Sequence, residues 1–460
     1  MASHDPEQLV FSQEVDSFIK PILGVEDRPK TLWETLFYAW QMTLVDFTPF
    51  IWAGMFVSLA GLPATILPVM ISTCFLAMGL ATLIQTMFGN RLPIVQGPSS
   101  SLLTAMGPVT AMYGFPAMWG AVLVGGVLEI LLGMSRLLGR IRKFIPPVVT
   151  GSIVATIGFV AARISLTWMF GSRSYLHLVL AFAAFVLALF LKFRCRGIVS
   201  RGFILIATLL VGVGATSLLG EYDWSKVSAT PWFALPTLFP FRGFDGTDTA
   251  VTFVFAAILG GFTGYVGSMF ESLGDYAATC AVSGVQYKVK HINRGIAAEG
   301  VGCVISGFLG ALPVTSYTQN IGIIAVTGIA SRWVIQVAGV MFIFYGLSPK
   351  LAMMLACIPR SVVGGVFLLS ASLIMFSGMD LILSEKRSLN NNLVAGTAIG
   401  VAVMLPFYAG TAGAQWAASL PPFWKMYVGN SVFIAVTVGV IMNLLVNRLL
   451  VPKDGIPEQF

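Results

Sequence analysis

The sequence SMFESLGDY at residues 268–276 lies in an apolar stretch long enough to cross a membrane. It contains two carboxylates, Glu271 and Asp275, whose four-residue spacing places both on one face of a helix. A charged side chain near the centre of a bilayer costs roughly 2.5–3.5 kcal/mol on insertion scales. Two acids at this depth indicate a cavity, a proton path or a substrate site, so the stretch predicts a transport protein.

The composition of the whole chain agrees with a membrane location. Of its 460 residues, 57% are hydrophobic and 10% are charged, whereas a soluble domain carries about 25% charged residues. An ordinary soluble fold is therefore excluded. The five cysteines are scattered without metal-ligand spacing, and we find neither a nucleophile–base set nor a phosphate-binding loop. We expect no enzyme activity, no metal and no cofactor.

Stretches of about 20 apolar residues predict fourteen membrane-spanning helices, of which the third and tenth are short. They are expected at 33–60, 64–88, 97–112, 117–138, 147–170, 175–193, 202–220, 249–273, 295–312, 318–330, 333–348, 361–383, 392–418 and 426–450. If the N-terminus is cytoplasmic, most of the 27 Lys and Arg residues lie on the inside, as the positive-inside rule requires. The pattern predicts an all-α, multi-pass protein of the plasma or inner membrane, in contact with lipid, with both termini cytoplasmic. The net charge of +7 is then a signal of topology and not of a nucleic-acid partner.

Two features of the second half of the chain echo the first half. The sequences IPPVVTG at 145–151 and IPRSVVG at 358–364 match at four of seven positions, at an offset of 213 (358 − 145). Pro93 and Pro313 lead into the two short helices. Repeats that lie seven helices apart have opposite orientations in the membrane, because seven is odd. Inverted repeats with broken helices are typical of secondary transporters, whose site lies between the half-helices.

The tenth helix is expected to be broken within GALPVTSYTQNIG at 310–322. Pro313 prevents a continuous helix, and the residues after it favour an extended conformation. The half-helix that begins near Gln319 would leave free N–H groups inside the membrane. The amides of Gln319 and Asn320 suit a neutral heterocyclic ligand, although helix capping and interhelical bonding are an alternative role.

The third helix mirrors this arrangement in PIVQGPSSS at 93–101. Pro98 fits the first turn of a helix, and the serines that follow can bond exposed backbone groups. Two broken segments at matching places in the two halves favour a binding site between them. Ser100 and Ser101 are therefore candidate substrate contacts.

Further polar groups are expected inside the membrane. Glu299, Asp46 and Glu129 are acids in predicted helices, and Gln41 could bond a substrate or bridge two helices. Close carboxylates in a low dielectric retain protons, which suits a group that takes up a proton with the substrate. Asp275, Glu299 and Asp46 are candidates for proton coupling or for site architecture. A carboxylate that is paired with Arg or capped by hydroxyls is the structural alternative.

Three motifs resemble the nucleobase–ascorbate transporter family, also called nucleobase:cation symporter-2, and are closest to its xanthine/urate type. They are ESLGDY at 271–276, PVTSYTQNIG at 313–322 and SR at 331–332. The resemblance implies a 7+7 inverted repeat, symport driven by H⁺ or Na⁺, and an elevator-like motion of a core domain against a gate domain. It also implies that Glu271 and Gln319 bond a purine-like nucleobase, with Asn320 and Gln41 in support.

The resemblance also implies a division of the chain into domains. The core domain would comprise 33–138 (helices 1–4) and 249–348 (helices 8–11). The gate domain would comprise 139–248 and 349–450 and would form a homodimer. The cytoplasmic segments would be 1–32 at the N-terminus and 451–460 at the C-terminus.

Two departures from the family pattern concern the substrate. The family commonly has Gln-His on helix 1, where this chain has Gln41-Met42, and an aromatic residue on helix 3, where Ser100 stands. The lost ring removes part of an apolar wall, so a different or bulkier organic substrate is an alternative. An anion transporter of the related 7+7 fold is a second alternative, although acids in the site would repel an anion. A channel or a ligand-sensing receptor is a third.

Overall fold

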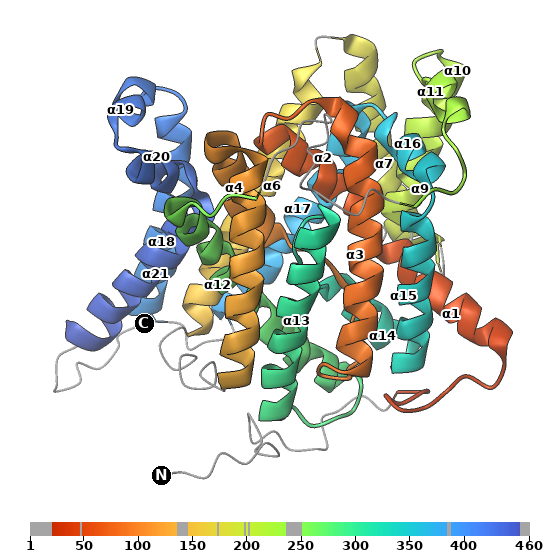
Figure 1. Ribbon diagram of the computed structural model, residues 1–460, viewed down its shortest axis with the longest axis horizontal. Coiled ribbons are helices and arrows are strands. Elements are labelled where there is room, and N and C mark those ends of the chain that lie inside the picture. The colour runs from red at the N-terminus through yellow and green to blue at the C-terminus, as the bar shows by residue number, and fades with distance from the viewer. Residues whose placement is uncertain are drawn as a thin grey trace.

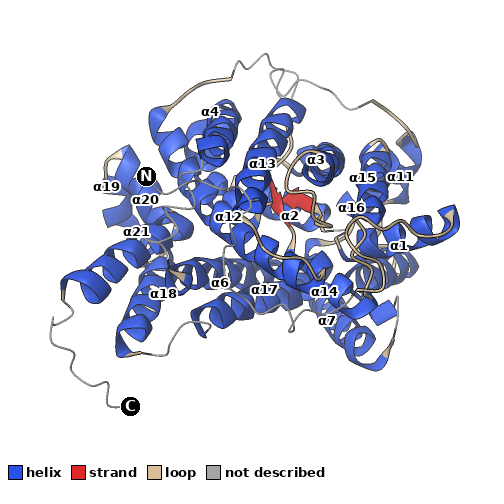
Figure 2. Cartoon of the chain, turned by 90° about the horizontal axis from the view of Figure 1, so that it is seen from below, coloured by secondary structure: helices blue, strands red, loops and turns tan. Residues whose placement is uncertain are grey.

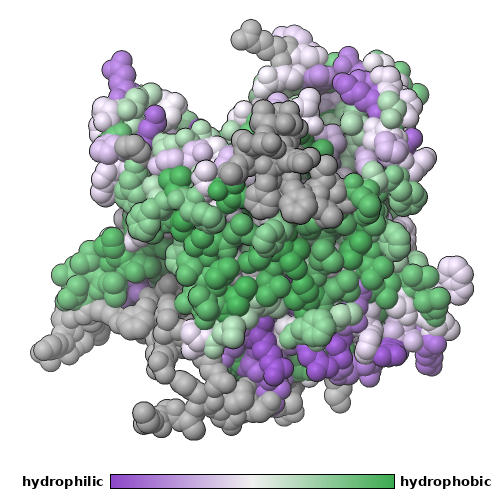
Figure 3. Space-filling view, in the orientation of Figure 1, coloured by the Kyte–Doolittle hydropathy of each residue, from purple (hydrophilic) through white to green (hydrophobic). Residues whose placement is uncertain are grey.

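The computed structural model describes residues 21–46, 48–135, 146–172, 174–196, 199–200, 203–235, 251–383 and 388–450, and these residues are almost entirely helical (Figures 1 and 2). Seven of the described helices are long and apolar enough to cross a membrane, or nine if each of two bent pairs counts as one span. Figure 3 shows an apolar band around the middle of the molecule and polar residues toward both ends. The predicted helical, multi-pass membrane protein is confirmed, whereas the number of fourteen spans stays a prediction.

The first half of the chain contains nine of the described α-helices and one strand. They are α1 (Leu32–Val45), α2 (Pro49–Leu59), α3 (Leu67–Met87), β1 (Gln96–Pro98), α4 (Ser100–Ser135), α6 (Pro147–Gly171), α7 (Tyr175–Arg194), α9 (Phe203–Leu209), α10 (Thr216–Leu218) and α11 (Trp224–Ala229), with a 3-10 turn at Ala64–Ile66 and a π-helical turn at Leu210–Ala215. The second half follows with α12 (Phe255–Val282), α13 (Val289–Leu309), β2 (Val314–Ser316), α14 (Thr318–Thr327), α15 (Arg332–Gly346), α16 (Pro349–Ala356), α17 (Arg360–Leu383), α18 (Leu389–Ala409), α19 (Ala414–Ser419), α20 (Pro422–Gly429) and α21 (Ser431–Leu444), with a π-helical turn at Leu445–Leu449.

Several predicted helix boundaries are wrong. The predicted helix 33–60 is interrupted between α1 and α2, where Pro49, which has no backbone N–H, opens α2; Leu32–Leu59 is still long and apolar enough to count as one candidate span. The break predicted between the helices 97–112 and 117–138 is confirmed, because Gly114, with φ 79°, interrupts the helical backbone within α4. The last predicted span, 426–450, bends by 89° between α20 and α21. A hydropathy pattern reports apolar length, and it does not detect such a change of direction.

The helices α12 and α13 extend beyond the apolar stretches that predicted them. The prediction 249–273 becomes Phe255–Val282, and the prediction 295–312 becomes Val289–Leu309. Polar residues such as Lys290 and Arg294 mark the end of an apolar stretch, but a helix continues through them where it leaves the membrane. The loop between these helices is therefore shorter than the sequence suggests.

The two strands cross antiparallel in the interior, surrounded by α2, α3, α12 and α13 (Figure 2). All six strand residues are buried. Around them the long helices pack in pairs, α3 on α15, α4 on α13, and α6 on α17. Glycines allow these close approaches: a Cβ added to Gly79 would lie 2.5 Å from the carbonyl oxygen of Gly339, and one added to Gly300 would lie 2.6 Å from that of Gly126.

Candidate functional site

The strand crossing brings the two broken segments together. Gln96 pairs with Ser316, and Pro98 pairs with Val314. Backbone hydrogen bonds extend the pairing on both sides, from Tyr317 N to the carbonyl of Val95 and from Ser99 N to that of Pro313, each 2.9 Å long. The helices α4 and α14 begin directly after the strands, so two helix N-termini lie inside the protein. The predicted pair of broken segments is thus present as one unit.

Glu271 lies on α12 beside the start of α4. Its Oε2 accepts a hydrogen bond of 2.9 Å from the hydroxyl of Ser101. Glu271 is only partly buried, in contrast to the fully buried Glu299. Among the described residues, no ion pair involves either of these two acids. The predicted site residues Glu271 and Ser101 are therefore in direct contact, and the Glu271 carboxylate has acceptor capacity that Ser101 does not use.

Glu299 of α13 is at the centre of the polar interior. Its Oε1 accepts hydrogen bonds from the hydroxyl of Tyr276 at 2.7 Å, from the backbone N–H of Ser316 at 3.1 Å and from Nε2 of Gln96 at 3.3 Å. Its Oε2 accepts a fourth from the hydroxyl of Ser272 at 2.7 Å. One carboxylate thus connects α12, α13, β1 and β2. Such complete hydrogen bonding fixes the relative positions of these four elements.

Asp275 belongs to a chain of hydroxyl groups between α12 and β2. The hydroxyl of Ser316 lies 2.9 Å from Oδ2 of Asp275 and 2.9 Å from the hydroxyl of Ser272. The hydroxyl of Thr315 lies 2.9 Å from that of Ser272 and accepts a hydrogen bond of 2.8 Å from Ser268. A hydroxyl has one proton, so Ser316 donates to one neighbour at a time. The contacts of Asp275 match the hydroxyl-capped alternative.

The hydroxyl chain and Tyr276 were not among the predicted site residues. Ser268 and Ser272 lie seven and three residues before Asp275, so they share its helical face (275 − 268 and 275 − 272). That spacing could have identified them. The partners on β2 could not have been found in this way, because the pairing of Ser272 with Thr315 spans 43 residues of sequence.

Asn320, on the first turn of α14, is fully buried and supports the segment that leads into β1. Its Nδ2 donates to the carbonyl of Pro93 at 3.0 Å, and its Oδ1 accepts from the backbone N–H of Val95 at 3.4 Å. Both ends of the amide are therefore engaged by backbone groups. The geometry gives Asn320 a supporting role, and a direct substrate contact stays a prediction.

The remaining predicted site residues lie on neighbouring elements. Gln41 is buried on α1, and Asp46 is fully buried at the break between α1 and α2. Neither oxygen of the Asp46 carboxylate has a hydrogen-bond partner among the described residues. The backbones of Ser100 and Gln319 open α4 and α14, while their side chains lie outside what the structure describes.

Comparison with known proteins places this geometry in a family. The protein-family model described as Permease family (Xan_ur_permease) matches residues 33–411 of this chain. The uric acid permease PucK of Bacillus subtilis is 30% identical over 73% of this chain and 78% of its own length. The xanthine permease XanQ of Escherichia coli K12 is 29% identical over 83% of this chain and 85% of its own.

A solved structure supports the fold assignment. The transmembrane domain of the cyanobacterial bicarbonate transporter BicA superimposes with a TM-score of 0.59 over 91% of this chain and 99% of that chain, at 14% sequence identity. At this identity the likeness concerns the fold alone. Since the family match covers most of the sequence, the chain belongs to this permease family, the nucleobase–ascorbate transporters, and within it to the xanthine/urate type.

Proposed function

We propose that this protein is a secondary active transporter that carries a purine-like nucleobase of the xanthine or urate type. The observation that carries the proposal is the position of Glu271, a partly buried carboxylate beside the strand crossing whose hydrogen-bond partner among the described residues is Ser101. A carboxylate in this state can accept hydrogen bonds from the ring N–H groups of a base. The names of the relatives, uric acid permease and xanthine permease, support the same class of substrate and a transporter rather than an enzyme.

The proposed substrate contacts are Glu271, Gln319, Asn320, Gln41, Ser100 and Ser101. Glu271 and Gln319 would make the main hydrogen bonds, because one lies beside the start of α4 and the other in the first turn of α14. The free N–H groups at these helix ends would favour the carbonyl oxygens of a purine. Asn320 would act mainly by holding the backbone before β1 in place.

The proposed driving ion is H⁺, with Na⁺ as the alternative. Protonation of Glu271 would change its oxygen from acceptor to donor and so link substrate binding to proton uptake. Asp275 and Glu299 would hold the site together, since their hydrogen bonds go to the protein itself. Asp46, which lacks a partner in the described part of the chain, is the further candidate for a proton site.

The 7+7 inverted repeat is part of the proposal, and mirrored contacts support it. At the offset of 213, Gly151 corresponds to Gly364 and Ser165 to Gly378 (364 − 151 and 378 − 165). A Cβ added to Gly151 would lie 2.5 Å from the carbonyl oxygen of Gly378, and one added to Gly364 would lie 2.7 Å from that of Ser165. Equivalent residues thus make equivalent contacts across α6 and α17, as a two-fold axis between the halves would require.

The proposed mechanism is an elevator-like motion. The core domain, 33–138 and 249–348, would move with the strand crossing and the bound base against the gate domain, 139–248 and 349–450. The gate would form a homodimer in the cell membrane, with the cytoplasmic segments 1–32 and 451–460 on the same side. Within the core, the bonds of Glu299 join four elements, which suits a unit that moves as one body.

The test is uptake of radiolabelled xanthine and urate by cells that lack their own purine permeases. Glu271→Gln and Gln319→Ala are each expected to lower uptake at least tenfold at equal amounts in the membrane. Glu221→Gln is the matched control, because Glu221 is an exposed acid outside the crossing. Unchanged uptake in both site variants would refute the proposal.

Experiments on the same cells and purified protein distinguish the alternative functions from purine transport. If the substrate is a different or bulkier organic molecule, purine uptake will be absent. Another ligand will then stabilise the purified wild type but not Glu271→Gln. An anion transporter would exchange bicarbonate or chloride without any effect of purines. A channel would give large unitary currents, whereas a symporter gives slow flux that depends on substrate.

A further inference from the structure

A pocket lies at the end of the helical bundle where α3 ends and α13 begins; these two helix ends are at the lower edge of Figure 1. Its volume is about 260 Å³. Four segments form its walls: the N-terminal segment before α1, the loop after α3, the loop between α12 and α13, and the first turns of α13. The lining residues are Val25, Glu26, Asn90, Arg91, Leu92, Val285, Lys290, His291 and Arg294.

This pocket is separate from the proposed substrate site. Glu271 lies on α12, eleven residues before the end of that helix at Val282 (282 − 271), and the pocket touches the loop after this end at Val285. Eleven residues of α-helix span about 16 Å. A ligand of this pocket would therefore not contact the Glu271 carboxylate.

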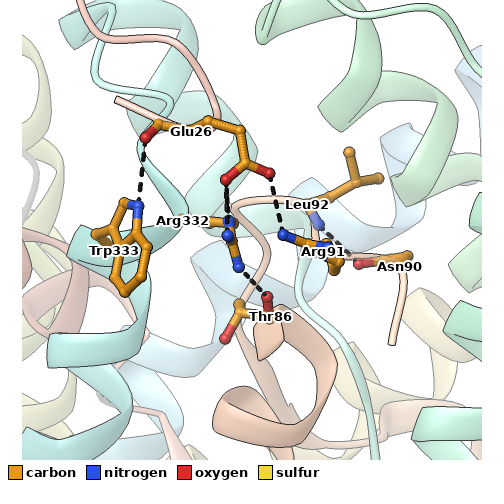
Figure 4. Close-up of polar contacts among 7 residues, drawn as sticks. All are labelled: Glu26, Thr86, Asn90, Arg91, Leu92, Arg332 and Trp333. Carbon is orange, nitrogen blue, oxygen red and sulfur yellow. Dashed lines mark hydrogen bonds and ion pairs between the residues drawn. The ribbon is translucent and has the colours of Figure 1, made fainter. Parts of the chain in front are cut away.

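The pocket carries an excess of positive charge. Arg91, Lys290 and Arg294 line it together with His291, and Glu26 is the one acid among the lining residues. The carboxylate of Glu26 is already engaged by a basic group outside the lining, since Nη2 of Arg332 lies 2.6 Å and Nε 2.8 Å from its Oε2 (Figure 4). Among the lining residues themselves, three permanent cations thus stand against one acid.

The position of two of these cations makes the excess more pronounced. Lys290 and Arg294 lie in the first two turns of α13, a helix of 21 residues. The N-terminus of a helix carries partial positive charge, which disfavours cations and favours an anion. An anion in the pocket would interact favourably with both the side chains and the helix end.

The loop after α3 supplies an observation that is independent of the charges, the amide of Asn90. Asn90 is 5% exposed, its Oδ1 accepts from Leu92 N at 3.0 Å, and its Nδ2 has no hydrogen-bond partner among the described residues. Arg91 has φ 61°, the one positive φ of a non-glycine residue in the described part of the chain. Backbone conformations of this kind cluster at ligand-binding positions, and the Arg91 guanidinium lies 3.5 Å from Oε1 of Glu26 (Figure 4).

From these observations we propose that the pocket binds a phosphate-bearing anion, either a free phosphate compound or the headgroup of an anionic phospholipid. The guanidinium groups and the ammonium group would bond the phosphate oxygens, and the Asn90 amide would donate a further hydrogen bond. Because Val25 and Glu26 form one wall, the bound anion joins the N-terminal segment to α13. The proposal is independent of the transported substrate.

The experiment measures thermal unfolding of the purified full chain in two settings. In detergent, inorganic phosphate is titrated against chloride at constant ionic strength. In nanodiscs, phosphatidylglycerol is compared with phosphatidylcholine. Lys290→Gln/Arg294→Gln is the test variant, and Arg194→Gln/Lys425→Gln is the control, since it removes the same charge from exposed residues elsewhere. Asn90→Asp is a second, nearly isosteric test variant that places a negative charge in the pocket.

A free phosphate compound is supported if phosphate raises Tm, if both test variants weaken the apparent affinity for phosphate about tenfold, and if the control variant keeps the wild-type response. A rise confined to phosphatidylglycerol nanodiscs, with the same dependence on the variants, supports a lipid headgroup. The proposal is overturned if neither ligand raises Tm, or if the rise is equal in the wild type and Asn90→Asp. Uptake does not enter this readout, so failure here and failure of the proposed transport function are distinguishable.

Discussion

Removing the Glu299 carboxylate tests whether the strand crossing depends on this one side chain. The side chain accepts four hydrogen bonds, two from hydroxyls at 2.7 Å, one from a backbone N–H at 3.1 Å and one from an amide at 3.3 Å. At about 1 kcal/mol net for each bond, Glu299→Ala would lose roughly 4 kcal/mol, before any cavity is counted.

Glu299→Gln should be far milder. The glutamine oxygen can occupy the Oε1 position and keep the three bonds made there, from Tyr276, Ser316 and Gln96. Its NH₂ group would then face the Ser272 hydroxyl, which can turn to accept. We expect a loss of about 1 kcal/mol, since one bond is reversed and none is abolished.

The assay is thermal unfolding in detergent, followed by size-exclusion profiles of the heated protein. Glu271→Ala is the matched control, because Glu271 has one hydrogen bond among the described residues and is partly exposed. The expected order of stability is wild type, then Glu271→Ala and Glu299→Gln close together, and Glu299→Ala far below. The reasoning is refuted if Glu299→Ala is as stable as Glu271→Ala.

Three further substitutions address separate parts of the site. Ser101→Ala should leave folding intact and weaken purine uptake several-fold, because it removes the hydroxyl that orients Glu271; kinetics of uptake at varied substrate concentration would show no change if Ser101 is unimportant. Gly97→Ala should cost about 1–3 kcal/mol, because the added Cβ would lie 2.4 Å from Cζ of the Tyr317 ring, and a thermal scan equal to that of the wild type would contradict the steric argument. Asp46→Asn should not lower stability, because no partner of its carboxylate is present among the described residues. If Asp46 takes part in coupling, uptake by this variant, measured from pH 5 to 8, should lose its dependence on pH.

The sequence predicted local features of the site well. The spacing of Glu271 and Asp275 placed them on one helix, and Pro313 followed by Val-Thr-Ser predicted the extended segment that is β2. These predictions hold because helical spacing and the restrictions of proline depend on neighbouring residues. For Ser101 and Glu271 the sequence predicted only that both belong to one site, and not that they form a hydrogen bond.

The long-range contacts were beyond such reasoning. The bond from Gln96 to Glu299 joins residues 203 positions apart, and nothing in either local sequence specifies the other. The break before Pro49 and the 89° bend between α20 and α21 were also missed, because an apolar stretch predicts how far a helix could extend but not where it is interrupted or turns. Propensity and hydropathy describe single segments, whereas the site is built by packing between them.

The antiparallel pairing of Gln96–Pro98 with Val314–Ser316 has a consequence for how the chain is made. Extended backbone inside a bilayer must find partners for its N–H and C=O groups, and each unsatisfied group costs several kcal/mol. The partner of Gln96 is synthesised 220 residues later (316 − 96), which takes roughly 11–44 s at ordinary translation rates. During that interval the first strand has to stay near water or borrow hydrogen bonds from the translocation machinery. Neither half of this protein can reach its mature form alone, and its assembly in the membrane is completed only after the second strand has left the ribosome.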